Sequence, residues 1–433
     1  MSAEVQNEMM RRGNREGSEL FRKWFQGLNQ ASDEGKSAAY VFVMGSLAEI
    51  LHAFDMPIVM PEITSLQTAV RRKSADLLNE AEDHGYSPDI CGYVKADYAI
   101  QSRGGEHPLG RLPKPGLALL TNACNTYLKW GEMWGRMFDT PLFTLDIPGT
   151  RAKGTQSWPG DPQFETEKRY VRAQIDELIQ TCEEITGKEF DIERLKQNLE
   201  YSNRMSAAWK GILECNKKGP AVFNALSDGT VYLSVNNVWR GTEEGAEYFE
   251  RLLEEKRWMN ENRIGAAKEE RHRLAFIGVP CYPIFKEFSE LFTDWGGVFV
   301  ISTYLWFASG GNNLGVQYDL EDPLDSLAEV TLIHVRDAMD SMFHPEQVLL
   351  ENLDDFGIEG VVYHPIKSCR TISTGLADNR RELMEKTDLP SLFIESDMMD
   401  KRVISVAQMK NRVDAFFEGI EMRKATRLQE AAQ

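Results

Sequence analysis

Three cysteines occupy positions at which folded chains present side chains to ligands. Cys124 follows the apolar residues 117–120 and precedes apolar residues at helical spacing, which predicts a strand, a cysteine and then a helix. Cys91 follows a serine–proline pair typical of a helix start, and Cys369 comes soon after a predicted buried strand at 361–363. Open α/β sheets bind ligands at the carboxyl ends of their strands, and helix N-termini favour the thiolate form of cysteine. These three thiols are therefore the first candidates for chemistry.

Thiolates are soft ligands, and three of them converging on a cleft between two lobes could hold an iron–sulfur cluster. A four-iron cluster with three protein ligands keeps one iron free for an exogenous ligand or a substrate. The alternative is that these cysteines are small buried apolar side chains, as scattered cysteines usually are. Residue spacing alone does not decide between the two.

The other three cysteines are predicted to belong to the core. Cys182 and Cys215 lie on apolar stripes of charged helical stretches. Cys281 follows a predicted strand and could be an additional thiol beside a cluster, but its neighbouring prolines favour a shaped, packed loop. The chain has no C-x-x-C pair, which argues against a disulfide framework and against zinc ribbons or fingers.

The composition is that of a globular protein with two or three domains. The chain has 433 residues, of which 42% are hydrophobic and 27% charged, and no low-complexity tract. Its formal net charge of -18 disfavours nucleic acid as a partner, since phosphate contacts need a basic surface. No apolar run approaches the ~18 residues that span a membrane, and the N-terminal residues lack the apolar core of a signal peptide. The sequence therefore predicts a cytoplasmic protein with no membrane partner.

Apolar strands alternating with amphipathic helices predict an α/β fold. Two portions of the chain have this pattern, separated by a charged helical segment. We therefore expect two Rossmann-like (flavodoxin-like) parallel-sheet lobes, with the cluster in the cleft between them. Residues 64–85 are expected to form one long helix. The predicted divisions are an N-terminal helical segment (1–36), a first α/β lobe with Cys91 and Cys124 (37–160), a helical middle segment (161–268) and a second α/β lobe with Cys369 (269–433).

A phosphate-binding loop is incompletely matched near the N-terminus. Gly35, Lys36 and Ser37 match the end of the motif, but Gln30 stands where its first glycine is required. The chain therefore carries no nucleoside triphosphatase signature of its own.

Five segments carry a resemblance to a known family: GSLAEILHAFDMPIV, YSPDICGYVKADYA, LALLTNACNTYLKW, IEGVVYHPIKSCR and LPSLFIESDMMDKRVISVAQMKNRVDAFFEGIE. Through them the chain resembles the 2-hydroxyacyl-CoA dehydratase and benzoyl-CoA reductase family, from Tyr40 to Phe417. The resemblance implies a heterodimer of two related subunits, each with a [4Fe–4S] cluster bound by three cysteines, here Cys91, Cys124 and Cys369. It also implies a separate ATP-hydrolysing iron–sulfur activator, with reduced ferredoxin as the upstream donor. The incomplete phosphate-binding loop agrees with that division of labour.

Within this family, the length, the helical middle and the NACNTYLKW and HPIKSC segments are most similar to the larger, electron-accepting B subunits of ATP-dependent (class I) benzoyl-CoA reductases. The implied reaction is a two-electron reduction of the aromatic ring of benzoyl-CoA to a cyclic dienoyl-CoA in anaerobic aromatic degradation. One alternative is a subunit of an (R)-2-hydroxyacyl-CoA dehydratase, which eliminates water through a ketyl radical with no net consumption of electrons. Another is a non-catalytic subunit that scaffolds such a complex and relays electrons.

Ring reduction needs proton donors near the substrate, and three residues are candidates for catalytic roles. Glu49 aligns with an acidic residue near the cluster in the family; its alternative role is that of a solvated or capping carboxylate. His52 lies on the same helix face at nearly one turn's spacing, where a hydrogen-bonded, partly buried histidine is the alternative. His364 precedes the Cys369 loop and could relay protons, or could form a strand-end hydrogen bond.

Two further features could contact the substrate. Trp130 and Trp134 are expected to pack in the core rather than to stack on an aromatic ring. The loop at 310–313 could contact the pantetheine or nucleotide part of coenzyme A, or could be a plain surface turn.

Overall fold

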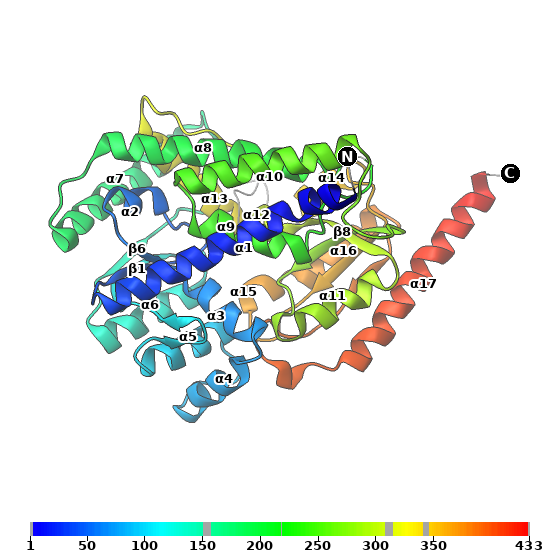
Figure 1. Ribbon diagram of the computed structural model, residues 1–433, viewed down its shortest axis with the longest axis horizontal. Helices are drawn as coiled ribbons and strands as arrows, with labels where there is room; N and C mark the ends of the chain where they lie inside the picture. The colour runs from blue at the N-terminus through cyan, green and yellow to red at the C-terminus, as the bar shows by residue number, and fades with distance from the viewer. Residues whose placement is uncertain (1–2, 150–156, 218, 308–314, 341–345, 432–433) are drawn as a thin grey trace.

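The computed structural model describes residues 3–149, 157–217, 219–307, 315–340 and 346–431. Two parallel sheets of four strands each lie in different halves of the molecule, and helices flank both (Figure 1). This arrangement confirms the predicted α/β fold with two parallel-sheet lobes. The domain boundaries proposed from the sequence stay a prediction.

The first sheet has the strand order β2-β1-β5-β6, and every neighbouring pair is parallel. Its strands are β1 (Ala38–Val41), β2 (Ile58–Val59), β5 (Pro115–Thr121) and β6 (Leu142–Leu145), and a separate antiparallel ribbon is formed by β3 (Glu106–His107) and β4 (Gly110–Arg111). The central strands β1 and β5 are almost wholly buried. Their continuous apolar runs suit a parallel sheet that is covered on both faces.

The second sheet repeats this plan with the order β10-β9-β7-β8, again all parallel. Its strands are β7 (His272–Gly278), β8 (Gly297–Ser302), β9 (Gly360–His364) and β10 (Ser391–Phe393). In each sheet the chain first extends to one side of the starting strand and then returns to its other side. The strand order therefore reverses between β1 and β5, and again between β7 and β9, and the carboxyl ends of strands at such reversals are where open α/β sheets bind ligands.

The helices of the first lobe differ from expectation at one point. They are α2 (Ala48–Ala53), α3 (Pro61–Val70), α4 (Ser74–Asp83), α5 (Gly92–Ser102) and α6 (Asn125–Phe138). The single helix predicted at 64–85 is wrong, because Arg72 has a φ of 59° and this left-handed residue separates α3 from α4.

Long helices of the middle segment cover the sheets on one side (Figure 1). They are α7 (Pro162–Thr186), α8 (Ile192–Glu214), α9 (Ser227–Val238) and α10 (Glu243–Glu261), and α1 (Ala3–Asp33) packs against α9 and α10. Two of them have side-chain caps: Asp191 accepts hydrogen bonds from the first-turn N–H groups of α8, and Thr242 accepts one at the start of α10. Cys182 and Cys215 are buried in this layer, which confirms their assignment to the core.

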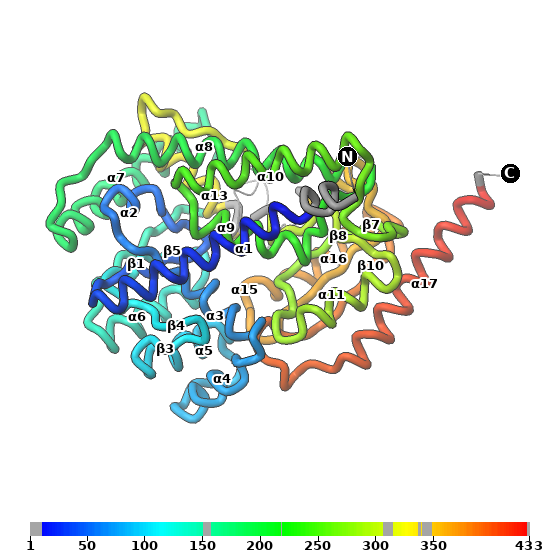
Figure 2. Tube along the Cα trace, viewed as in Figure 1, coloured from blue at the N-terminus to red at the C-terminus, as the bar shows by residue number. Residues whose placement is uncertain are grey.

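The remaining helices are η1 (Tyr282–Ile284), α11 (Phe285–Thr293), α12 (Thr303–Phe307), α13 (Pro323–Asp340), α14 (Glu346–Asn352), α15 (Arg370–Ser373), α16 (Leu376–Lys386), η3 (Lys401–Val403) and α17 (Val406–Ala431). Although α13 falls within the sequence range predicted for the second lobe, it packs against α7 and joins the apolar core around the first sheet. Helix α17 packs through Val413, Phe417 and Ile420, and its C-terminal end projects from the body (Figure 2).

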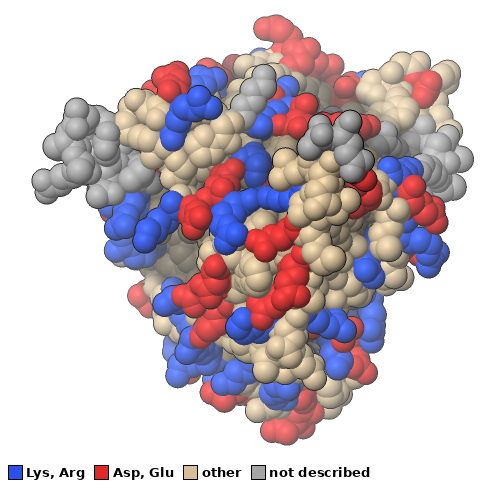
Figure 3. Space-filling model, turned by 90° about the vertical axis from the view of Figure 1, so that its right-hand side faces the viewer, with Lys and Arg blue, Asp and Glu red and all other residues tan. Residues whose placement is uncertain are grey.

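The surface mixes charges of both signs. On the face shown in Figure 3, basic and acidic side chains are interspersed among the described residues rather than gathered into a basic track. No helix in the described parts of the chain combines the length and the apolar character that crossing a membrane requires.

Candidate active site

A cavity of about 130 Å³ lies between the two lobes and receives residues from both. Residues after β1, β2 and β5 form its first-lobe wall, and the end of β7 with residues after β8, β9 and β10 forms the opposite wall. They include the strand ends at which the two sheets reverse their order. Cys91, Cys124 and Cys369 all line this cavity.

Each of the three cysteines stands directly before a helix. Cys91 precedes α5, Cys124 precedes α6 and Cys369 precedes α15, and all three are free and partly buried. Sγ of Cys124, from the first lobe, lies 3.2 Å from Oγ1 of Thr371 in the second lobe. The structure therefore brings together the three thiols that the sequence singled out, each at the start of a helix.

The thiols are close enough to influence each other's ionisation. Burial raises the pKa of Cys91 well above its ordinary value, and the neighbouring thiols Cys369 and Cys124 raise it further. Burial likewise raises the pKa of Cys369 to about 12, with a further contribution from Cys124. A cationic ligand in this cavity would favour the deprotonated forms of Cys91 and Cys369.

Three soft sulfur donors line this one cavity. Within the described ranges, no three His, Cys, Asp or Glu side chains come close enough to bind one metal ion. Thiolates that bind different iron atoms of a cluster can stand farther apart than the ligands of a single ion. Three soft sulfur donors around one cavity therefore suit iron–sulfur chemistry.

Glu62, on the first turn of α3, also lines this cavity. It was not predicted from the sequence as a site residue. The N–H group of Val43 donates to its Oε2 at 2.9 Å, and the Tyr127 hydroxyl donates to its Oε1 at 2.8 Å. Burial of the carboxyl raises the pKa of Glu62 to about 7 despite both hydrogen bonds. One feature of the sequence could have indicated Glu62: it is an acidic residue soon after β2, and β2 is the neighbour of β1, where the strand order reverses.

The rest of the cavity wall is largely apolar and includes aromatic side chains. Tyr93 and Tyr304 line it, and the ring of Tyr127 stacks on Phe42 with a centroid distance of 3.8 Å. Such a lining excludes water and accommodates a flat apolar group. An apolar cavity of ~150 Å³ is known to admit benzene, so this one is of comparable capacity.

The chain is similar to known proteins over most of its length. A family model described as 2-hydroxyglutaryl-CoA dehydratase, D-component, matches residues 45–420. The B subunit of benzoyl-CoA reductase from Thauera aromatica is 31% identical over 440 aligned residues, which cover 98% of each chain. The alpha subunits of (R)-2-hydroxyisocaproyl-CoA dehydratase from Clostridioides difficile and (R)-2-hydroxyglutaryl-CoA dehydratase from Acidaminococcus fermentans are 26% and 24% identical, and the alignments cover 94% and 93% of this chain and 96% of each relative.

The chain belongs to the 2-hydroxyglutaryl-CoA dehydratase D-component family. The resemblance found in the sequence is thereby confirmed.

All three predicted catalytic residues lie outside the large cavity of this dehydratase-family chain. Glu49 lines a small neighbouring cavity of about 20 Å³, room for one water molecule, and this cavity shares Val43 with the large one. The Glu49 side chain accepts hydrogen bonds from Ser202 at 2.7 Å and from Nε of Arg240 at 2.8 Å. Burial would raise the pKa of Glu49, but the charge of Arg240 and the hydrogen bond from Ser202 outweigh it and hold the pKa below its ordinary value.

His52 lies near Glu49 on α2. Burial lowers its pKa, and its Nε2 is buried with no hydrogen-bond partner among the described residues. His364 is fully buried at the end of β9, where Nδ1 lies 2.6 Å from the carbonyl oxygen of Val279 and Nε2 contacts the hydroxyl of Ser396. Burial lowers the pKa of His364 to about 4. The structure brings none of the three predicted catalytic residues to the cysteine cavity, and their catalytic roles stay predictions.

The remaining candidate site residues either pack in the core or lie outside the residues that the structure describes. Trp130 forms part of the cavity wall, but its indole N–H and that of Trp134 both donate to Oδ2 of Asp97, at 2.7 and 2.8 Å. Cys281 is fully buried and does not line the cavity, as expected for a core residue. The loop at 310–313 lies outside the residues that the structure describes.

Proposed function

We propose that this chain is the iron–sulfur subunit of the catalytic component of an ATP-dependent benzoyl-CoA reductase. Cys91, Cys124 and Cys369 are the proposed ligands of one [4Fe–4S] cluster. The observation that carries the proposal is the convergence of these thiols, from two lobes, on one largely apolar cavity. The similarity to the B subunit of a benzoyl-CoA reductase over nearly the whole chain supports the choice of reaction.

The proposed reaction adds two electrons and two protons to the ring of benzoyl-CoA and yields a cyclic dienoyl-CoA. A cluster held by the three thiolates would supply single electrons at low potential. Glu62 is the proposed proton donor, because it lines the cavity and its raised pKa keeps a proton available near neutral pH. Tyr127 holds that carboxyl in place through its hydroxyl, and the largely apolar wall limits the access of water. Glu49, His52 and His364 are proposed to act from behind this wall, on proton supply.

The proposed partners follow from the family. They are a homologous second subunit, an ATP-hydrolysing iron–sulfur activator and, upstream, reduced ferredoxin, acting together in the cytoplasm. The names of the relatives as B and alpha subunits support a partner subunit for this chain.

A second candidate is a subunit of an (R)-2-hydroxyacyl-CoA dehydratase. The description of the family model and the similarity to two dehydratase alpha subunits favour it. Both reactions use the same thiols, but only ring reduction consumes reductant. The ratio of reductant oxidised to acyl-CoA converted separates them: one two-electron equivalent for each ring reduced, and only catalytic amounts for dehydration.

The test of the cluster is iron and acid-labile sulfide per chain, measured on protein expressed with its partner and purified without oxygen. We expect about four irons for this chain, and loss of iron in the Cys91→Ala, Cys124→Ala and Cys369→Ala variants. Cys182→Ala, at a fully buried position on α7, is the control and is expected to keep its iron. Folded wild-type protein that turns over without iron would refute the proposal.

A non-catalytic relay subunit gives a different result. In that case Glu62→Gln would leave turnover intact, whereas loss of Cys91 would slow electron delivery. If Glu62→Gln lowers the turnover of protein with full iron content, the relay alternative is excluded.

A further inference from the structure

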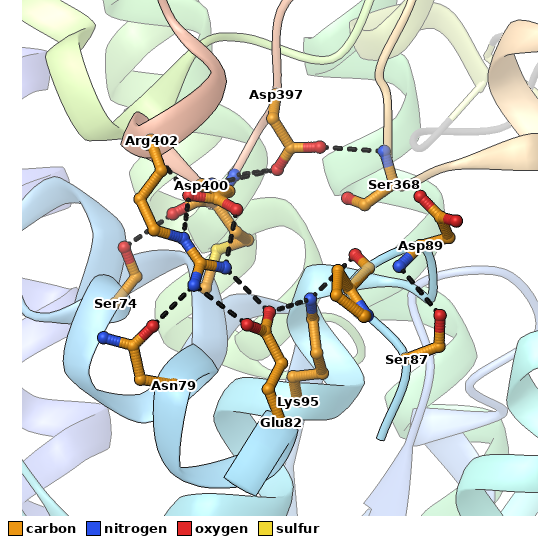
Figure 4. A network of polar contacts seen from close by, with 12 residues as sticks. Ser74, Asn79, Glu82, Ser87, Asp89, Lys95, Ser368, Asp397, Asp400 and Arg402 are labelled. Atoms are coloured by element: carbon orange, nitrogen blue, oxygen red, sulfur yellow. Dashed lines mark hydrogen bonds and ion pairs between the residues drawn. The ribbon is translucent and has the colours of Figure 1, made fainter. Parts of the chain in front are cut away.

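A network of charged side chains crosses from the first lobe to the second beside the loops that carry Cys91 and Cys369 (Figure 4). It comprises Glu82 on α4 and Lys95 on α5, with Asp397, Asp400 and Arg402 from the segment after β10. We call these five residues the interlobe network.

The guanidinium group of Arg402 joins the two lobes. Its Nη1 donates to Oε2 of Glu82 at 2.9 Å and its Nη2 donates to Oε1 at 2.7 Å, so the pair is bidentate. Nε and Nη2 also donate to the two carboxylate oxygens of Asp400, each at 2.8 Å. Hydrogen bonds from Arg402 lower the pKa of Glu82 to about 2, so these contacts are charge-assisted.

Lys95 ties the same carboxylate to the Cys91 loop. Its side chain is 1% exposed, and Nζ donates to Oε1 of Glu82 at 2.8 Å and to the carbonyl oxygen of Pro88 at 2.9 Å. Pro88 stands shortly before Cys91, and Lys95 stands one helical turn after it. The network therefore holds the chain on both sides of Cys91.

Asp397 ties the Cys369 loop to the network through a hydrogen bond to the main chain. Its Oδ2 accepts a hydrogen bond at 2.8 Å from the N–H group of Ser368, which directly precedes Cys369. Its Oδ1 accepts from the N–H groups of Met399 and Asp400, at 2.8 and 2.9 Å. One carboxylate thus connects the cysteine loop to the segment that carries Arg402.

The two cysteine-bearing loops also touch directly. A Cβ atom added at Gly92 would lie 2.6 Å from Cβ of Met399 and 3.6 Å from Oγ of Ser368, so the chain next to Cys91 abuts the segments around Cys369. No side chain of the interlobe network lines the cavity. The network therefore lies behind the cavity wall, where it is placed to act on a cavity ligand through the position of the cysteines.

We propose that the interlobe network sets the spacing of Cys91 and Cys369, and that Arg402, Lys95 and Asp397 are positioning residues for the thiol set. The inference deepens the proposed function and rests on it for the identity of the ligand. The alternative is that the network only stabilises the docking of the two lobes. A readout of thiol spacing separates these two roles.

Two control variants match Arg402→Gln in different respects. Arg204, on α8, makes a bidentate pair with Glu250 and is 34% exposed, against 35% for Arg402, but it is remote from the cysteine loops. Arg72 pairs with Glu287 between the lobes at 2.6 Å, but neither residue belongs to a cysteine loop. Arg204→Gln therefore controls for loss of a partly buried ion pair, and Arg72→Gln for loss of an interlobe contact.

The first measurement uses the metal-free, full-length chain and a short reagent with two thiol-reactive ends. Mass spectrometry then gives the yield of the peptide pair in which Cys91 is linked to Cys369. We expect Arg402→Gln to change this yield by about threefold, because a partly exposed ion pair has a modest effect on an equilibrium, and we expect the two controls to match wild type. Glu82→Gln removes the same bidentate pair from the side of the first lobe and is expected to act in the same direction; it replaces Arg402→Gln if that variant does not fold.

The second measurement is the rate at which iron-loaded protein loses iron to a chelator. We expect a faster loss from Arg402→Gln than from either control. If the wild type binds no iron, the proposed function fails while the cross-linking result still tests the spacing. If Arg402→Gln matches wild type, or if all three arginine variants change equally in both measurements, the positioning role is refuted.

Discussion

Replacing Gly92 by alanine would place a methyl group between the two cysteine-bearing loops. Gly92 is the first residue of α5 and directly follows Cys91. The new Cβ atom would lie 2.6 Å from Cβ of Met399 and 2.9 Å from its Cγ. Because Cβ of Met399 is attached to the backbone, rotation of the Met399 side chain cannot remove the first contact. The segment after β10 or the start of α5 must move.

Two opposing effects decide the magnitude. Overpacking a close contact costs about 1–3 kcal/mol. Alanine gains at most ~1 kcal/mol over glycine in a helix interior, and less at the first position. The net loss in the free energy of unfolding is therefore about 1–2 kcal/mol, and movement should also alter the spacing of Cys91 and Cys369.

Urea unfolding of the metal-free chain, followed by circular dichroism, measures this effect. Gly27→Ala on α1 is the control, because no atom lies within 4 Å of the added Cβ. It is expected to move the urea midpoint upward, by the equivalent of about 0.5–1 kcal/mol, while Gly92→Ala moves it downward. A Gly92→Ala protein as stable as Gly27→Ala would show that the two loops do not abut, and would remove the steric basis for coupling the two thiols.

Two further variants test buried carboxylates. Glu62→Gln should raise the temperature of thermal unfolding at pH 8 and change it little at pH 5. The pKa of Glu62 is raised by burial, so ionisation of this carboxyl as the pH rises destabilises the folded state, and glutamine removes that cost. Equal effects at both pH values would contradict the shifted pKa. Arg240→Met should lower the free energy of unfolding by about 3 kcal/mol, since it leaves Glu49, which is 1% exposed, without its cation. Urea unfolding measures this loss, and Arg240→Met combined with Glu49→Gln should recover part of it; no recovery would show that the charge of Glu49 is not the cause.

The sheets and the cysteine positions could be predicted because their signals are local. The buried runs at 117–120 and 361–363 are apolar throughout, and each is followed by a cysteine near the next helix start. The break between α3 and α4 could not be predicted in this way. It occurs at Arg72, in a run of basic residues with no glycine or proline to mark a left-handed conformation.

The choice between acidic residues depended on long-range contacts. Glu49 and Glu62 both lie in the first turn of a helix after a strand, and nothing local distinguishes them. Arg240, 191 residues away in sequence, pairs with Glu49, whereas Glu62 has only a hydroxyl and an N–H group as donors. Their pKa values therefore shift in opposite directions, which the sequence alone could not reveal.

The division of the three thiols between two lobes also has a consequence for biosynthesis. Cys124 leaves the ribosome 245 residues ahead of Cys369, which corresponds to roughly 10–50 s of translation. During that interval the growing chain contains two of the thiols and lacks the third. The complete set exists only after β9 has joined β7 and the lobes have docked. Insertion of the proposed cluster would thereby be restricted to chains that extend beyond Cys369, and a product truncated before Cys369 would lack one of the three proposed ligands.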